Sequence, residues 1–324
     1  MKKKYLIAAL ILMFLFALSQ FDGQGLLNSI TKIPISVVIL LLAFQIVSQL
    51  LVNFQWYKIA AFTGMSLSFD KMFYINCQGS VVDSITPGVK VGGEVTRAVQ
   101  ISRICDCSGE DAAAVVALQK LFSMSTFFFI NLFAVGYLIG NVQLFQARFV
   151  QLSVYALLIL FLALFFFVFL MPNRIKIYLQ TRTNPRFPKM LRVKNFFLVL
   201  LEHVGALRKN TGSWVVLLLL AFMIWLIYPL KMYFLVIHIH PGANPVFIGA
   251  VTFISYMVAM IPIFPGGLGG FEATMSGLLL AIGFIRSDAL IVTIVFRFVT
   301  FWFVMLLSLV YILLYRKLKI NLQN

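Results

Sequence analysis

The chain has 324 residues, of which 62% are hydrophobic and only 11% are charged. Soluble domains usually contain about 45–50% apolar and about 25% charged residues, so this composition excludes an ordinary soluble domain and indicates a membrane protein. The formal net charge is +16, but the basic residues lie between apolar segments and form no continuous basic stripe, so we expect no nucleic-acid partner.

Six segments are long and apolar enough to cross a bilayer as helices, which takes about 20 residues. In chain order they are 5–21, 36–56, 112–139, 150–171, 213–236 and 288–314. The first follows three lysines and ends in small residues, a pattern also found in cleavable signal peptides. The sequence therefore predicts an all-α polytopic membrane protein, with about six transmembrane helices in a single transmembrane domain over residues 1–324.

Two further apolar segments, 72–89 and 246–285, are interrupted by proline and glycine. Proline breaks a helix, and irregular backbone at membrane depth is tolerated only where protein buries it or where it lines a water-filled cavity. We therefore predict that both segments are re-entrant hairpins and that they contain the functional part of the chain.

The basic residues predict the orientation in the membrane. If each hairpin returns to its side of entry, 19 lysines and arginines lie on the side of the N-terminus, and three lie on the other side: Lys32, Arg148 and Arg286. Cytoplasmic loops are enriched in lysine and arginine, so we expect both termini in the cytoplasm and the chain in the cell membrane. The basic segment 172–212 is then a cytoplasmic linker between a first repeat at 36–171 and a second, inverted repeat at 213–315.

The two interrupted segments share the motif P-G-x-x-x-G-x-E. The first copy consists of Pro87, Gly88, Gly92 and Glu94, with an additional glycine at Gly93. The second copy consists of Pro265, Gly266, Gly270 and Glu272, with additional glycines at Gly267 and Gly269. Glycine and proline are common in membrane segments, so one copy would be weak evidence, but two copies in corresponding hairpins indicate an internal repeat.

The similarity continues after each motif. Asp111 precedes Lys120 by nine residues, and Asp288 precedes Arg297 by nine residues. Because an odd number of spans separates the two copies, the second copy enters the membrane from the opposite side. Many transporters have such inverted repeats, and their binding sites lie near the midplane at interrupted helices.

The motif provides groups that bind charged ligands. Its glycines allow a tight turn, and a helix that begins near the glutamate exposes N–H groups that attract anions such as phosphate. Glu94 and Glu272 either contact a cationic group of the substrate, carry coupling protons, or have a structural role at the helix start. Lys120 and Arg297 either neutralise these carboxylates or contact a lipid phosphate. Charged side chains at membrane depth are costly and usually mark function.

Other charged residues are weaker candidates. Asp83 and Lys90 either form a pair within the first hairpin or contact the substrate. Lys231 follows Tyr228-Pro229 inside a span, and either lines the cavity or accompanies a helix kink. The sequence contains no hydrolase, zinc or nucleotide-binding motif of the G-x-S-x-G, H-E-x-x-H or Walker type, so we expect no cofactor and no metal ion.

These motifs resemble those of the lysylphosphatidylglycerol synthase transmembrane-region family. The segment from Thr86 to Ala98, T-P-G…G-G-E-V-T-R-A, resembles the first signature of that family, and F-P-G-G-L-G-G-F-E at 264–272 resembles the second. The resemblance extends from about residue 5 to 315 and implies a flippase-like integral membrane protein. One departure is Lys120, where the family pattern has arginine. The candidate substrate-binding residues are therefore Glu94, Glu272, Arg297, Lys120, Arg97 and Lys231.

The resemblance leaves more than one function open. The leading hypothesis is a transporter for anionic or aminoacylated membrane phospholipids, like the flippase module of the multiple peptide resistance factor. The alternatives are a phosphatidylglycerol lysyltransferase, a membrane subunit of a lipid- or glycan-modifying enzyme, or a structural partner of such an enzyme. Lysyl transfer in the family depends on a separate soluble domain. The sequence ends at Asn324, shortly after the last predicted span, so we expect no lysyl transfer.

Overall fold

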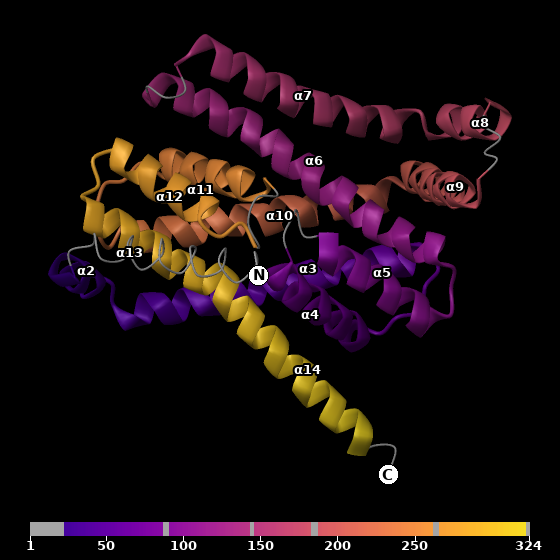
Figure 1. The fold of residues 1–324 in the computed structure, drawn as a ribbon, viewed down its shortest axis with the longest axis horizontal. Coiled ribbons are helices and arrows are strands. Elements are labelled where there is room, and N and C mark those ends of the chain that lie inside the picture. Colours follow the sequence, from indigo (N-terminus) through magenta and orange to yellow (C-terminus); the bar gives the residue numbers. More distant parts are fainter. Residues whose placement is uncertain (1–22, 87–90, 143–145, 183–186, 262–265, 322–324) are drawn as a thin grey trace, which may run out of the picture.

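The computed structural model describes residues 23–86, 91–142, 146–182, 187–261 and 266–321 (Figure 1). These residues form helices joined by short connections, and none of them forms a strand. This confirms the predicted all-α fold of a polytopic membrane protein.

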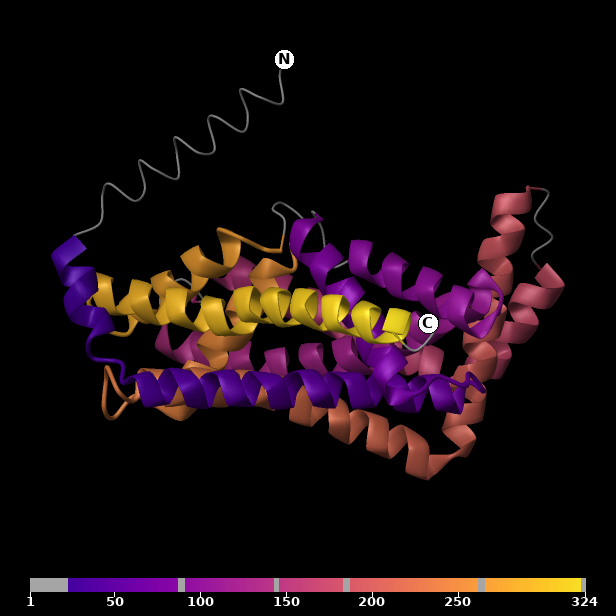
Figure 2. The same cartoon turned by 90° about the horizontal axis from the view of Figure 1, so that it is seen from below.

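Five helical segments are long and apolar enough to cross a membrane, and they confirm five of the six predicted spans. In Figure 2 they run along the long axis of the molecule, whereas in Figure 1 some of them, the last one above all, cross that axis at a slant. The predicted span 5–21 lies outside the described residues. The short helix α2 (Gly23–Ile30) precedes the first described span and packs on α13. The five segments are α3 (Ile35–Phe62), α6 (Gly109–Asn141), α7 (Arg148–Leu170), α10 (Thr211–Val236) and α13 (Arg286–Arg297), which continues through the π-helical turn η2 (Phe298–Trp302) into α14 (Phe303–Asn321).

Two pairs of shorter helices form the hairpins. The first hairpin consists of α4 (Phe69–Ile85) and α5 (Val91–Cys105), and the second of α11 (Pro245–Ala259) and α12 (Gly270–Ala281). Within each hairpin the two helices pack against each other. At a rise of 1.5 Å per residue these helices are roughly 18–26 Å long, which is less than the roughly 30 Å of a bilayer core. Their lengths therefore fit helices that enter the membrane without crossing it.

The first hairpin is larger than predicted. The prediction ended at residue 89, but the hairpin includes the whole of α5 and ends at Cys105. Helix α5 contains Glu94, Arg97 and Arg103, so its mean hydropathy is low and its sequence does not look like a membrane segment. It is held in place by packing on α4 and α6 instead.

The two hairpins enter the molecule from opposite ends. Helix α4 starts at the end where α3 stops, whereas α11 starts at the other end, after α10 has run the length of the bundle (Figure 1). The chain therefore has the inverted arrangement of its two hairpins that the sequence predicts.

The segment 172–212, predicted as a basic linker, is largely helical. It forms two helices, α8 (Pro172–Arg182) and α9 (Pro188–Lys209). Each begins with proline, which has no N–H group and is tolerated in the first turn of a helix. The C-terminal half of α9 is amphipathic, and Leu200, Val204 and Leu207 are buried in the hydrophobic cluster that includes Phe122 of α6.

Buried polar side chains bond across helices between the spans. Asn53 of α3 bonds to Asn76 of α4, and Gln119 of α6 bonds to Gln55 of α3. Gln55 in turn donates to the carbonyl of Leu217 in α10. Such bonds help to hold helices together in lipid, where apolar surfaces have little preference for one another over the lipid tails.

Candidate functional site

Glu94 and Lys120 form an ion pair beside the first hairpin. Glu94 lies in the first turn of α5, and its Oε1 is 2.6 Å from Nζ of Lys120 in the middle of α6. About a quarter of each side chain is exposed, 23% for Glu94 and 27% for Lys120. A ligand that approaches this side of the hairpin can therefore reach both charges.

Glu272 and Arg297 form the equivalent pair beside the second hairpin. Glu272 lies in the first turn of α12, and its Oε1 is 2.9 Å from Nε of Arg297 at the end of α13. The other carboxylate oxygen accepts the N–H of Gly269 at 2.6 Å, which closes the start of α12. Gly269 has a φ of +87°, a backbone conformation that favours glycine.

Arg297 is held more firmly than Lys120. Its guanidinium lies 4.8 Å from the ring of Phe271 and 4.3 Å from the ring of Phe301, and it donates from Nη2 to the carbonyl of Gly266. Only 6% of its side chain is exposed. Its Nε is close to Glu272 but has no aligned hydrogen-bond acceptor among the described residues. The cation of the second repeat is thus enclosed by aromatic rings, whereas that of the first repeat is accessible.

Arg97 pairs with Asp83 inside the first hairpin. Asp83 Oδ2 accepts from Nη1 of Arg97 at 3.1 Å, and Oδ1 accepts the N–H of Gly93 at 3.0 Å. The guanidinium also lies 5.6 Å from the ring of Trp56. Asp83 thus pairs with Arg97, and Lys90, its expected partner, lies outside the described residues. Like that of Arg297, Nε of Arg97 lacks a hydrogen-bond acceptor within the described part of the chain.

The two hairpins meet at their inner ends. A Cβ atom built on Gly266 would lie 3.6 Å from the carbonyl oxygen of Ser84 near the end of α4, and 2.5 Å from the ring of Phe301. Gly266 and Gly267 both have positive φ, and Gly267 is in close contact with Ala259. The glycines of the second motif therefore allow close contacts with both hairpins. The motif residues Pro87, Gly88 and Pro265 lie outside the described residues.

Lys231 is completely buried between α10 and α3. Its ammonium donates to Oε1 of Gln45 and to Oγ of Ser48 at 3.2 Å, and it lies 4.2 Å from the centre of the Tyr228 ring. Among the described residues no carboxylate forms an ion pair with it. A series of ring contacts, Tyr228 to Tyr256 and Tyr256 to Phe271, connects it to the site of Arg297.

The remaining charges of the repeat lie at the ends of helices. Asp111 accepts from the hydroxyl of Ser108 at the start of α6, and Asp288 is bound by Lys32 at 2.8 Å. Lys58 of the first repeat is exposed near the end of α3, whereas Lys231 of the second repeat is buried in α10. The two repeats thus share their glutamate–cation pairs but differ at this lysine.

Several residues around the site carry no signal in the sequence. Phe271 and Phe301 enclose Arg297, and Trp56 covers Arg97. The chain contains 34 phenylalanines, so no pattern in the sequence distinguishes Phe271 and Phe301 from the others. Only the position of Phe271 within the second motif, directly before Glu272, could have indicated its role.

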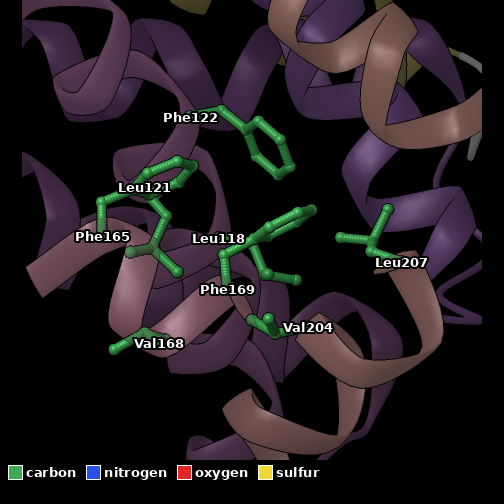
Figure 3. A pocket seen from close by; sticks show the side chains of 8 residues that line it. All are labelled: Leu118, Leu121, Phe122, Phe165, Val168, Phe169, Val204 and Leu207. Carbon is green, nitrogen blue, oxygen red and sulfur yellow. The ribbon is translucent and has the colours of Figure 1, made fainter. Parts of the chain in front are cut away.

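The described residues contain no group of three or more His, Cys, Asp or Glu side chains that could hold a metal ion. A hollow between α6, α7 and α9 is lined only by leucine, valine and phenylalanine, among them Leu118, Phe122, Phe169 and Leu207 (Figure 3). It offers no polar group to a headgroup. The glutamate–cation pairs of the hairpins are therefore the better candidates for binding a charged ligand.

Residues 4–308 match the family described as lysylphosphatidylglycerol synthase TM region. The chain belongs to this family. The match covers both hairpins and all five described spans, except for the last part of α14. Similar proteins include UPF0104 membrane proteins from three archaea, which fits a multi-pass membrane protein.

Two of these relatives align over almost their whole length. The protein from Methanocaldococcus jannaschii is 24% identical over 90% of this chain and 89% of its own. The protein from Pyrococcus horikoshii is 23% identical over 98% of this chain and 99% of its own. A third, from Methanothermobacter thermautotrophicus, is 24% identical over 70% of each chain.

Proposed function

We propose that this member of the family is a flippase-like transporter, which moves a phospholipid with a polar or aminoacylated headgroup between the leaflets. The observation that supports this most is the pair of matching ion pairs, Glu94–Lys120 and Glu272–Arg297, on hairpins that enter from opposite ends and meet. A lipid headgroup needs polar partners at every depth, because an uncompensated charge in the bilayer core is costly.

Each ion pair can exchange partners with a zwitterionic headgroup. An ammonium group of the lipid replaces the cation beside the glutamate, while the phosphate takes the cation that is released. The partly exposed pair Glu94–Lys120 is suited to this exchange, since a ligand can reach both side chains. Arg297 and Arg97 each retain a buried Nε without an aligned acceptor, and arginine binds phosphate well. The phosphate therefore has donors in both repeats.

The proposal is tested with the purified chain in vesicles that contain a fluorescent phospholipid, whose outer-leaflet fraction is bleached by a membrane-impermeant reductant. We expect Glu94→Gln and Glu272→Gln to fold but to lose translocation by about tenfold or more, since a hydrogen bond to a charged group contributes about 1.5–3 kcal/mol.

Glu202→Gln is the matched control, because Glu202 is also paired with a lysine, Lys176, but lies in α9 away from the hairpins. It should transport at the wild-type rate. Wild-type rates in both hairpin variants, with monodisperse protein, would exclude the role proposed for the carboxylates.

The same proposal includes the orientation and location of the chain, in the cell membrane with both termini in the cytoplasm. The end of the bundle that carries α8 and α9 is then cytoplasmic. Cysteines introduced at Gln180 and Arg148, which are both exposed, should react with a membrane-impermeant reagent from opposite sides in intact cells. Labelling of Gln180→Cys from outside the cell would show that the orientation is the opposite of the proposed one.

A second candidate function is suggested by the family description, which names a synthase. In this case the chain would transfer lysine to phosphatidylglycerol, or serve as the membrane partner of an enzyme that modifies lipids or glycans. Incubation of the purified chain with lysyl-tRNA and phosphatidylglycerol tests the transferase directly. We expect no lysylated lipid, and its formation would replace the transport proposal.

A further inference from the structure

Helices α8 and α9 lie across one end of the bundle. In Figure 1 the axis of α9 points nearly toward the viewer, whereas the spans lie in the plane of the picture, and in Figure 2 both helices run crosswise to the spans. Only Met171 separates the end of α7 at Leu170 from the start of α8 at Pro172. The length and composition of α7 fit a helix that crosses the bilayer. If α7 does so, α8 begins where the bilayer ends, and the two helices lie at the level of the lipid headgroups.

With the exception of Glu202, the exposed charges in the described part of these two helices are positive. From Pro172 to Lys209 the sequence contains one acidic residue, Glu202, and this residue is paired with Lys176. Arg174 on α8 and Lys189 and Arg192 on α9 are exposed. A surface of this charge attracts anionic groups and repels cationic ones.

Large apolar side chains are exposed between these charges. Phe187 is 67% exposed and Met190 is 60% exposed, and Ile177, Tyr178 and Val193 are exposed to a similar extent. The C-terminal half of α9 packs on α6, but no described part of the chain covers these five side chains. In water they would form a costly apolar surface, whereas helices that lie in a membrane interface combine such residues with lysine and arginine.

We propose that α8 and the N-terminal half of α9 bind the surface of the leaflet at their end of the bundle and select anionic phospholipids there. The apolar side chains insert at the boundary between headgroups and acyl chains, and Arg174, Lys189 and Arg192 contact lipid phosphates. The charge decides between possible occupants, since a leaflet rich in anionic lipid complements both the basic residues and the apolar ones. This binding does not depend on whether the chain transports lipid.

The depth of the helices is measured with an environment-sensitive fluorophore on Met190→Cys, in full-length protein whose native cysteines are replaced by serine. The protein is placed in nanodiscs of phosphatidylcholine with or without phosphatidylglycerol. We expect strong quenching by lipids with a spin label near the headgroup, weak quenching by aqueous iodide, and a stronger lipid contact when phosphatidylglycerol is present. A label at Asn173, exposed on α8 near the end of α7, serves as a reference position.

The contribution of the charges is measured by the binding of phosphatidylglycerol to the purified protein, for example by native mass spectrometry. Each basic residue near an anionic surface contributes about fivefold to binding, so Arg174→Gln, Lys189→Gln and Arg192→Gln together should weaken the anionic lipid preference by about a hundredfold. Arg148→Gln is the matched control, because Arg148 is an exposed cation at the opposite end of α7.

Two results would overturn the inference. In the first, iodide quenches the label at Met190→Cys strongly and lipid spin labels do not, in both kinds of nanodisc. This surface would then face water and be available to a protein partner. The other result is a triple variant that binds phosphatidylglycerol as well as Arg148→Gln does. Both measurements are independent of translocation, so either can fail while the proposed transport stands.

Discussion

Gly93 in α5 packs directly against the backbone of Gly79 in α4. A Cβ atom on Gly93 would lie 2.3 Å from the carbonyl oxygen of Gly79, and as close to the carboxylate of Asp83. Because this same carboxylate accepts the N–H of Gly93, the close contact and the hydrogen bond depend on each other. The absence of a side chain at Gly93 therefore sets the distance between the two helices of the first hairpin.

Gly93→Ala should destabilise the protein by about 1–3 kcal/mol, because the added methyl group must push α5 away from α4. The measurement is the thermal unfolding midpoint in detergent. Gly277→Ala in α12 is the control, since a Cβ there meets nothing within 4 Å and alanine favours a helix. An unchanged midpoint in Gly93→Ala would show that the hairpin can open at this point without cost.

The two cations of the repeats should respond differently to exchange of lysine and arginine. Arg297→Lys loses the planar group between Phe271 and Phe301 and the bond to Gly266, which together should cost about 2–4 kcal/mol of stability. Lys120→Arg should stay within about 1 kcal/mol of the wild type, because the pair is partly exposed. Equal losses in both variants would contradict the difference between the repeats.

Lys231→Met should be as stable as the wild type or more stable, by up to about 4 kcal/mol. The side chain is fully buried and its ammonium has only neutral partners, and buried charges replaced by an apolar group of similar volume are often stabilising. Lys58→Met, at an exposed position, should change stability by no more than about 0.5 kcal/mol. A severe loss of stability in Lys231→Met would show that the buried ammonium holds α10 to α3.

His203 in α9 should make the stability dependent on pH. Burial lowers the pKa of His203 below its usual value, and smaller effects of Asp111 and Glu202 oppose this shift. Between the lowered pKa of the folded state and the ordinary value of about 6.5, the unfolded chain binds more protons, so stability falls as the pH decreases through this range. We expect the difference between the unfolding midpoints at pH 7.5 and pH 5.5 to be smaller in His203→Gln. An identical difference would show that His203 titrates alike in both states.

The spans and the hairpin motifs could be predicted because both depend on local sequence. Apolar length alone identifies α3, α6, α7 and α10, since a helix is the simplest way to satisfy the backbone in lipid. The structure also brings Glu94 to Lys120 and Glu272 to Arg297, two of the partnerships that the sequence left open. Their roles in substrate binding stay predictions.

What the sequence could not predict depends on contacts between distant segments. Nothing local indicates that Asp83 takes Arg97 as its partner, because the partner is selected by the crossing of α4 and α5. The helices of segment 172–212 are hard to predict, because its basic residues and prolines are typical of a loop. In the structure, the buried leucines of α9 pack on α6. The sequence also does not show that Lys231 is buried, because its hydrogen-bond partners Gln45 and Ser48 lie on α3, 186 and 183 positions away.

The π-helical turn η2 joins two helices that contact different hairpins. Before it, α13 packs on α12 of the second hairpin, and after it, α14 packs on α4 of the first. Phe301, which lies on Arg297, is part of the turn itself. The continuous helical segment α13–η2–α14 therefore contacts both hairpins. If this segment moved as a rigid body, both hairpins would be disturbed at once. Any change in the angle between α13 and α14 at the π-helical turn beside Arg297 would shift the two hairpins relative to each other.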